Sequence, residues 1–367
     1  MSRALALLPL FAVTQVAAAQ LQDGPYVVRS PNGAWVARWI DGDDSAPHVR
    51  EAPVAAGGLV TVPAVGAVPA FDVKLRSFAA MPAADEVKLP SGVSLFVLAD
   101  THGEYAITVE LLRKQKIIDS KLKWSFGKGR LAVLGDIFDR GPNQTEILWL
   151  LYSLEAQAKA AGGAVYVMLG NHESMALGGD ERYLGAKYLK VRDALKAPDY
   201  ASLWSQDSLL GQWLRTKAAV MKIGDYVCLH GGISAEVVQR GLTLGQMNDS
   251  VRHSLGDRQP DGFVLSPNGP LWYRGYFPEA ARESGSAVAS SDDVDRILSF
   301  YKAKAIFVGH TIVSTVTALY DGRVIAVQVY PHRDDATAKP EMQGLLVKEG
   351  AFYRARIDGT LEPLISR

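Results

Sequence analysis

The stretch LAVLGDIFDRG, residues 131–141, joins a short apolar run to a cluster of acidic residues and glycines. Continuous apolar runs of this length, bounded by turn residues, are typical of strands buried on both faces. Four further runs have the same form: VSLFVLA (93–99), AVYVML (164–169), DYVCL (225–229) and AIFV (305–308). Between the runs lie amphipathic segments such as NQTEILWLLYSLEAQAKA (143–160), whose aliphatic residues recur on one helical face. This alternation predicts an α/β fold.

Every one of these runs ends in a polar cluster. The clusters are Asp100-Thr101-His102-Gly103, Gly135-Asp136-Ile137-Phe138-Asp139-Arg140-Gly141, Gly170-Asn171-His172-Glu173, His230-Gly231-Gly232 and Gly309-His310. In sheets of this kind ligands bind beyond the carboxyl ends of the strands, so we expect the clusters to converge in space. Four of the seven histidines fall within them. Carboxylate, amide and imidazole donors without a thiolate predict a site for manganese, iron, zinc or magnesium rather than a zinc finger.

The motifs D-x-H-G, G-D-x-x-D-R-G, G-N-H-E, H-G-G and G-H, in this order, resemble the phosphoprotein-phosphatase branch of the metallophosphoesterases. The segments GDERYLGAKY, KIGDYVCLHGGIS and LWYRGY are most similar to the bacterial Shewanella-like protein phosphatases. The resemblance covers residues 93–330. It implies a β-sandwich of two mixed sheets flanked by helices.

The resemblance also implies a centre of two divalent or trivalent metal ions, with manganese expected to support activity. The six implied ligands are Asp100 and His102 on the first ion, Asp136 between both ions, and Asn171, His230 and His310 on the second. A metal-bridging hydroxide would attack the phosphorus in line, because two cations lower the pKa of bound water towards neutrality.

Four further roles are implied by the same resemblance. His172 is expected to protonate the leaving oxygen as general acid, and Asp139 to orient it. Arg140 and Arg274, the latter in LWYRGY, are expected to bind the phosphate oxygens, which suit guanidinium geometry. The expected substrates are phosphate monoesters: phosphorylated proteins on Tyr or Ser/Thr, peptides, or small molecules.

Two other functions share parts of this pattern. A nucleotide or dinucleoside-polyphosphate hydrolase uses the same motifs. A non-catalytic metal-binding relative would keep the fold, although a mere binder has no need of the general acid His172 and its partner Asp139.

The composition excludes some partners. The 367 residues contain 39 basic and 39 acidic side chains, so the formal net charge is zero. Nucleic-acid binders and membrane-surface proteins usually show a basic excess, so we expect neither nucleic-acid binding nor stable membrane association. The single cysteine, Cys228, excludes an intramolecular disulfide and is expected to be a buried small hydrophobic residue.

The N-terminal part differs from the rest of the chain in its residue composition and apolar pattern. Arg3, the apolar run 4–13 and the small residues Ala17 to Ala19 predict a signal peptide over residues 1–19, hence a periplasmic or secreted protein. Residues 20–92 are expected to form a small β appendage and linker, with a hairpin around Pro31-Asn32-Gly33. The catalytic domain is then expected over residues 93–367.

Overall fold

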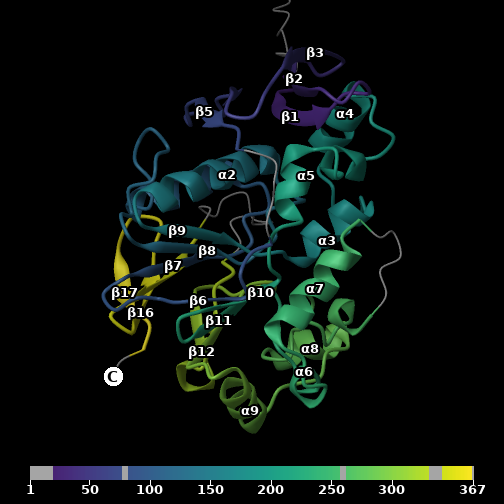
Figure 1. Cartoon of the computed structure of the whole chain (residues 1–367). Helices are drawn as coiled ribbons and strands as arrows, with labels where there is room; N and C mark the ends of the chain where they lie inside the picture. The colour runs from purple at the N-terminus through teal and green to yellow at the C-terminus, as the bar shows by residue number, and fades with distance from the viewer. Residues whose placement is uncertain (1–19, 77–81, 257–261, 330–340, 366–367) are drawn as a thin grey trace, which may run out of the picture.

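The computed structural model describes residues 20–76, 82–256, 262–329 and 341–365. Within these ranges the chain forms two six-stranded mixed sheets that pack face to face (Figure 1). The first sheet has the order β17 (Leu361–Pro363), β16 (Ala351–Ala355), β15 (Gly344–Lys348), β7 (Leu95–Leu98), β8 (Arg130–Val133) and β9 (Ala164–Val167). The second has the order β13 (Thr317–Leu319), β14 (Val324–Ala326), β12 (Ala305–Val308), β11 (Tyr226–Leu229), β10 (Val220–Ile223) and β6 (Glu86–Val87).

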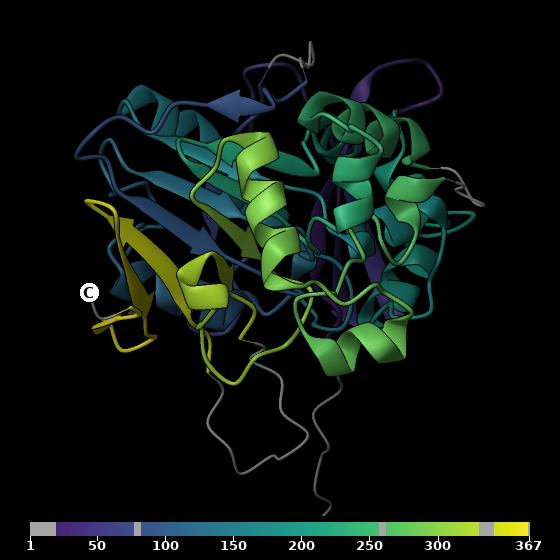
Figure 2. The same cartoon turned by 90° about the horizontal axis from the view of Figure 1, so that it is seen from below.

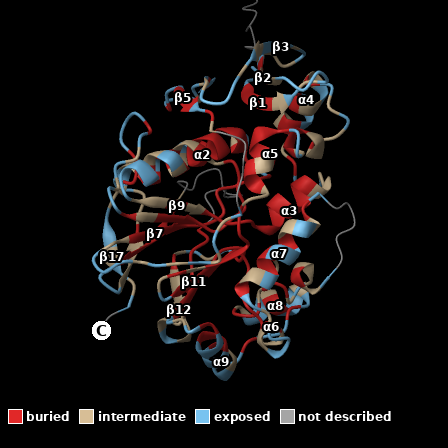
Figure 3. Ribbon diagram, viewed as in Figure 1, coloured by how far each residue is buried: buried red, intermediate tan, exposed pale blue. Residues whose placement is uncertain are grey.

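The apolar runs form central strands because both of their faces are covered. In β7, Leu95 and Val97 belong to the core between the two sheets, whereas Phe96 and Leu98 belong to the cluster shared with the outer helices. Successive side chains of a strand point to opposite faces, so a strand between two apolar layers must be apolar throughout. Figure 3 shows this buried zone running through the middle of the molecule.

Helices cover the outer faces of the sandwich, as Figures 1 and 2 show from two directions. The α-helices are α1 (Tyr105–Lys114), α2 (Gln144–Ala160), α3 (Asn171–Gly178), α4 (Ala186–Ala194), α5 (Leu209–Leu214), α6 (Ala235–Gln239), α7 (Leu244–Ser254), α8 (Pro278–Ser284) and α9 (Ser291–Tyr301). Short 3₁₀ turns are η1 (Ala201–Trp204), η2 (Phe263–Leu265) and η3 (Tyr320–Gly322). In the part of the chain that the structure describes, every helix is too short or too polar to cross a bilayer.

The N-terminal strands form a separate small sheet, β1 (Asp23–Arg29), β2 (Trp35–Asp43) and β3 (Ala46–Pro53), and a hairpin, β4 (Leu59–Val62) with β5 (Phe71–Lys74). The hairpin predicted around Pro31-Asn32-Gly33 is confirmed, because β1 and β2 pair antiparallel across this turn. The predicted signal peptide, residues 1–19, lies outside the described residues.

The small sheet packs on α2. The indole of Trp149 in α2 donates to the carbonyl oxygen of Pro25 at 2.8 Å, and almost the whole first half of the helix is buried. The sequence predicted one apolar face for this helix. The opposite face is buried too, because β1 and β5 cover it. Residues of the small sheet and of the large sandwich therefore share one apolar cluster.

Candidate active site

Five strands end at one edge of the sandwich, and the polar clusters that follow them lie together there. Strands β7, β8 and β9 run parallel in one sheet and β11 and β12 in the other, and each cluster begins where its strand ends. Asp100, His102, Asp136 and His310 have φ values of 48°, 41°, 52° and 60°. Non-glycine residues rarely occupy this left-handed region, and such strained backbone clusters at functional sites. The convergence predicted from the sequence is therefore present.

Two glycines let the strand ends approach this closely. A Cβ atom on Gly170 would lie 2.1 Å from Oδ1 of Asp136, and one on Gly309 would lie 2.3 Å from Oδ1 of Asp100. Both distances are far below van der Waals contact, so any side chain would displace a buried carboxylate.

One set of donor atoms surrounds the Nε2 atom of His230. It lies 3.1 Å from Oδ2 of Asp136, 3.1 Å from Nδ1 of His310 and 2.8 Å from Oδ1 of Asn171. All four side chains are buried. Asp136, His230 and His310 each offer one atom within 4.8 Å of the others, which is the spacing of a metal-binding group.

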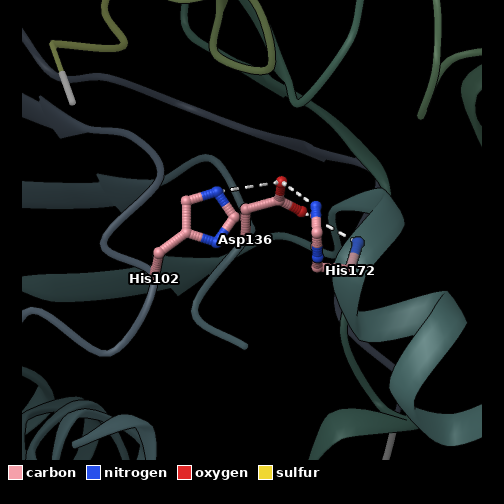
Figure 4. Close-up of side chains that lie close together, drawn as sticks. All are labelled: His102, Asp136 and His172. Atoms are coloured by element: carbon pink, nitrogen blue, oxygen red, sulfur yellow. Dashed lines mark hydrogen bonds and ion pairs between the residues drawn. The ribbon is translucent and has the colours of Figure 1, made fainter. Parts of the chain in front are cut away.

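A second set shares the same aspartate. Figure 4 shows the rings of His102 and His172 on either side of Asp136, whose Oδ2 atom lies 3.6 Å from Nε2 of His102 and 3.8 Å from Nε2 of His172. The fully buried Asp100 lies beside these groups, where its carboxylate accepts the backbone N–H of His310 at 3.1 Å. Asp136 thus occupies the central place that the resemblance assigned to a bridging ligand.

The histidine orientations suit metal ions. Nδ1 of His102 faces the carbonyl oxygen of Phe138 at 2.8 Å, and Nδ1 of His230 faces that of Leu134 at 2.9 Å. A histidine that donates one N–H to a backbone carbonyl presents the other nitrogen as a metal ligand. Among the described residues, Nε2 of His310 is buried with no hydrogen-bond partner. The donor set therefore fits a dinuclear centre of oxygen and imidazole ligands.

Burial also keeps two of these rings neutral, as metal ligation requires. It is the largest influence on both, lowering the pKa of His102 to about 3 and that of His310 well below its usual range. The neighbouring His230 differs, since the charges of Asp136 and Asp100 outweigh its burial and raise its pKa to about 9.

His172 forms a dyad with Asp139. Its Nδ1 atom donates to Oδ2 of Asp139 at 2.6 Å, so its Nε2 atom is left to face the centre of the site. Burial lowers the pKa of His172, but the carboxylates of Asp136 and Asp139 outweigh it and hold the pKa above its ordinary value. The ring is thus poised to carry a proton.

Of the two predicted arginines, Arg274 contacts this centre directly, and Arg140 acts on it through its charge. The guanidinium of Arg274 donates to the carbonyl oxygen of His310 at 2.7 Å, and the charges of Asp100 and Asp136 act on it. Arg140 is exposed, and its positive charge acts on His172 and Arg274. The positive charges of both arginines therefore act on the residues of this centre.

Glu173 has a structural role that the sequence did not reveal. Its buried carboxylate accepts backbone N–H groups of Asp136 at 2.8 Å, Ile137 at 2.7 Å and Gly170 at 2.6 Å. These bonds tie the turn after β8 to the start of α3. The position of Glu173 directly after Asn171 and His172 was the available signal.

Tyr183 borders the site from the loop between α3 and α4. Its ring centroid lies 5.3 Å from that of His172, its carbonyl oxygen accepts the backbone N–H of Arg140, and 49% of the residue is exposed. It occupies a turn beside His172.

Residues 93–314 match the family model described as calcineurin-like phosphoesterase. The chain belongs to the calcineurin-like phosphoesterases. This metallophosphoesterase is also similar to a solved structure from a psychrophilic Shewanella species, a cold-active protein-tyrosine phosphatase. The two are 36% identical with a TM-score of 0.80, over 94% of this chain and 99% of the other.

Two curated relatives are more distant. Shewanella-like protein phosphatase 2 of Arabidopsis thaliana is 25% identical over 68% of this chain and 74% of its own length. A symmetrical bis(5'-nucleosyl)-tetraphosphatase of Methylococcus capsulatus is 29% identical over only 46% of this chain and 57% of its own length. The nucleotide-hydrolase alternative is therefore not favoured.

The family and the site together establish the general activity. This metallophosphoesterase is a metal-dependent phosphatase with the dinuclear centre of its family, and its substrates are phosphorylated compounds.

Proposed function

We propose that this phosphatase acts on phosphorylated proteins or peptides, with a preference for phosphotyrosine, and that manganese supports its activity. The observation that carries the proposal is one buried aspartate, Asp136, set between two groups of histidines and beside the His172–Asp139 dyad. A histidine–aspartate dyad that can donate a proton, next to a dinuclear centre, is suited to the hydrolysis of phosphate monoesters.

Six residues would hold the ions. The proposed assignment is Asp100 and His102 on one ion, Asp136 between both, and Asn171, His230 and His310 on the other. When bound, the ions would neutralise the phosphate charge and lower the pKa of water towards neutrality.

The protein's own residues would supply binding and proton transfer. Arg140 and Arg274 would hold the phosphate oxygens in the bidentate geometry that guanidinium groups favour. His172 would donate its Nε2 proton to the leaving oxygen while Asp139 keeps its Nδ1–H in place.

The preference for an aryl substrate rests on Tyr183. An exposed aromatic ring 5.3 Å from the His172 ring lies where the leaving group of a monoester would depart. Aromatic pairs gain about 0.5–1.5 kcal/mol beyond their buried area, which favours a tyrosyl over a seryl leaving group. The Shewanella relative is itself described as a protein-tyrosine phosphatase.

We also propose that the protein is exported to the periplasm or the medium. Support comes from Arg3, the short apolar run 4–13 and the alanines before Gln20, which together form the pattern of a cleavable signal peptide.

Metal removal and substrate profiling test the activity. Chelation followed by desalting should abolish hydrolysis of 4-nitrophenyl phosphate, and manganese should restore it. Metal content measured on the same samples should reach two ions per chain in the active form. Matched peptides that differ only in phosphotyrosine or phosphoserine should then show a higher kcat/KM for phosphotyrosine. Full activity of the metal-free protein would exclude the metal mechanism, and equal kcat/KM values would exclude the tyrosine preference.

A further inference from the structure

The loop that carries the dyad carboxylate has an unfavourable backbone. Asp139 and Arg140 have consecutive φ values of 68° and 65°, in the region that few non-glycine residues occupy. Such a conformation persists only where its surroundings fix it. The Arg140 N–H is fixed by the Tyr183 carbonyl oxygen at 3.0 Å and the Gly141 N–H by the His102 carbonyl oxygen at 2.8 Å.

The backbone of Asp139 itself is held by a side chain. Its N–H donates to Oε1 of Gln144 at 2.6 Å, and Gln144 is fully buried at the start of α2. The amide group of Gln144 is fixed in turn, because its Nε2 donates to the hydroxyl oxygen of Tyr200. Its backbone N–H donates to the hydroxyl of Tyr188 at 2.8 Å. The side-chain oxygen, the side-chain nitrogen and the backbone N–H of Gln144 are therefore all hydrogen-bonded.

The two tyrosines belong to a buried group of aromatic side chains, called the aromatic wall here, which also contains Trp204, Phe138 and Tyr26 of the N-terminal sheet. Trp204 is its central member, with its ring centroid 5.8 Å from Tyr200, 5.7 Å from Tyr26 of β1 and 4.9 Å from Phe138 of the catalytic loop. The hydroxyl of Tyr26 lies 3.3 Å from Oγ1 of Thr145, the residue after Gln144. Strand β1 thus supports the loop from outside residues 93–314, the part that matches the family.

We propose that Gln144 is a positioning residue of the phosphatase reaction, and that β1 and the aromatic wall hold it in place. Gln144 fixes the backbone of Asp139, and through the Asp139 carboxylate it sets the direction in which His172 presents its proton. This inference rests on the proposed role of His172 as general acid.

The test compares two leaving groups. Gln144→Leu keeps the volume of the side chain and removes the acceptor oxygen. It should lower kcat for phenyl phosphate about 10–100-fold, which is the range for loss of a group that orients a metal ligand, and change kcat for 4-nitrophenyl phosphate much less. Nitrophenolate leaves with little need of a proton. Metal content should equal that of the wild type.

The matched control is Gln144→Glu. A buried glutamate that takes up a proton keeps a carbonyl oxygen for the Asp139 N–H and a donor for Tyr200, so it should restore the wild-type ratio of the two rates. In an Asp139→Asn background, Gln144→Leu should add no further sensitivity to the leaving group. If Gln144→Leu does not fold, Tyr200→Phe removes the hydroxyl that fixes the amide and should give the same signature in weaker form.

The outcomes separate the two proposals. If the Gln144→Leu protein keeps the wild-type ratio of the two rates, whether or not both rates fall, the positioning role is overturned while His172 remains the acid. An unchanged ratio in His172→Asn would overturn the general-acid assignment and this inference with it.

Discussion

Replacing His172 by asparagine should separate chemistry from metal binding. Nδ1 of His172 is committed to Asp139 at 2.6 Å, whereas its Nε2 faces the centre of the site. Asparagine keeps a nitrogen near the Nδ1 position and leaves no atom at Nε2. The variant should therefore lose the proton donor and keep the surrounding structure.

The size of the effect depends on the leaving group. The loss of a positioned general acid lowers the rate about 10²–10⁴-fold. At 1.36 kcal/mol per factor of ten, this is about 3–5 kcal/mol of transition-state stabilisation. We expect the full loss for phenyl phosphate. For 4-nitrophenyl phosphate, whose leaving group is stable as the anion, we expect a much smaller one.

Steady-state kinetics with both substrates, together with metal analysis, decide the matter. Asp136→Asn is the contrasting variant, because its carboxylate lies within reach of both groups of possible ligands. It should lose metal as well as activity towards both substrates. The reasoning about His172 is refuted if His172→Asn also empties the site, since His172 stands within ligand distance of His102 and Asp136.

Three further predictions concern other parts of the molecule. Tyr183→Ala should raise KM for phosphotyrosine peptides about fivefold, from the loss of roughly 1 kcal/mol of ring stacking, and leave KM for phosphoserine peptides unchanged. Burial raises the pKa of Glu146 to about 7, so its contribution to the free energy of unfolding is present below pH 4.5 and is lost as the pH rises towards 7. Chemical denaturation should show that the free energy of unfolding of the wild type declines by at most about 3 kcal/mol across this range, and that the Glu146→Gln protein lacks this decline. Parallel pH profiles of the two proteins would contradict this. N-terminal sequencing of exported protein should begin near Gln20, and a chain that retains Met1 in the exported fraction would exclude the cleavage.

The central strands and the convergence of the site could be predicted because both depend on short local patterns in the sequence. An apolar run such as 131–134 must be covered on both faces, and a polar cluster after each such run must meet its neighbours at one edge. Strands β10 and β15 to β17 were not predicted. β10 and β11 form one antiparallel hairpin, and β15 and β16 form another. The place of β15 to β17 in the first sheet depends on the pairing of β15 with β7, a partner distant in the sequence that local periodicity does not reveal.

The support of the site could not be predicted for the same reason. Gln144 stands only five residues after Asp139, but its effect depends on Tyr188 and Tyr200, which reach it from α4 and the turn before η1. Glu173 follows two site residues in the sequence, yet its role depends on backbone groups of the turn after β8. Such contacts are decided by the tertiary fold and leave no periodic trace.

The single cysteine has a practical consequence for spectroscopy. Cys228 lies fully buried in the core between the two sheets, and burial raises the pKa of its thiol, so it reacts poorly with alkylating dyes. A cysteine introduced at the exposed Ile312, two residues after His310, would be the one accessible thiol of the chain. A fluorophore attached there would report the arrival of unlabelled phosphopeptides at the site.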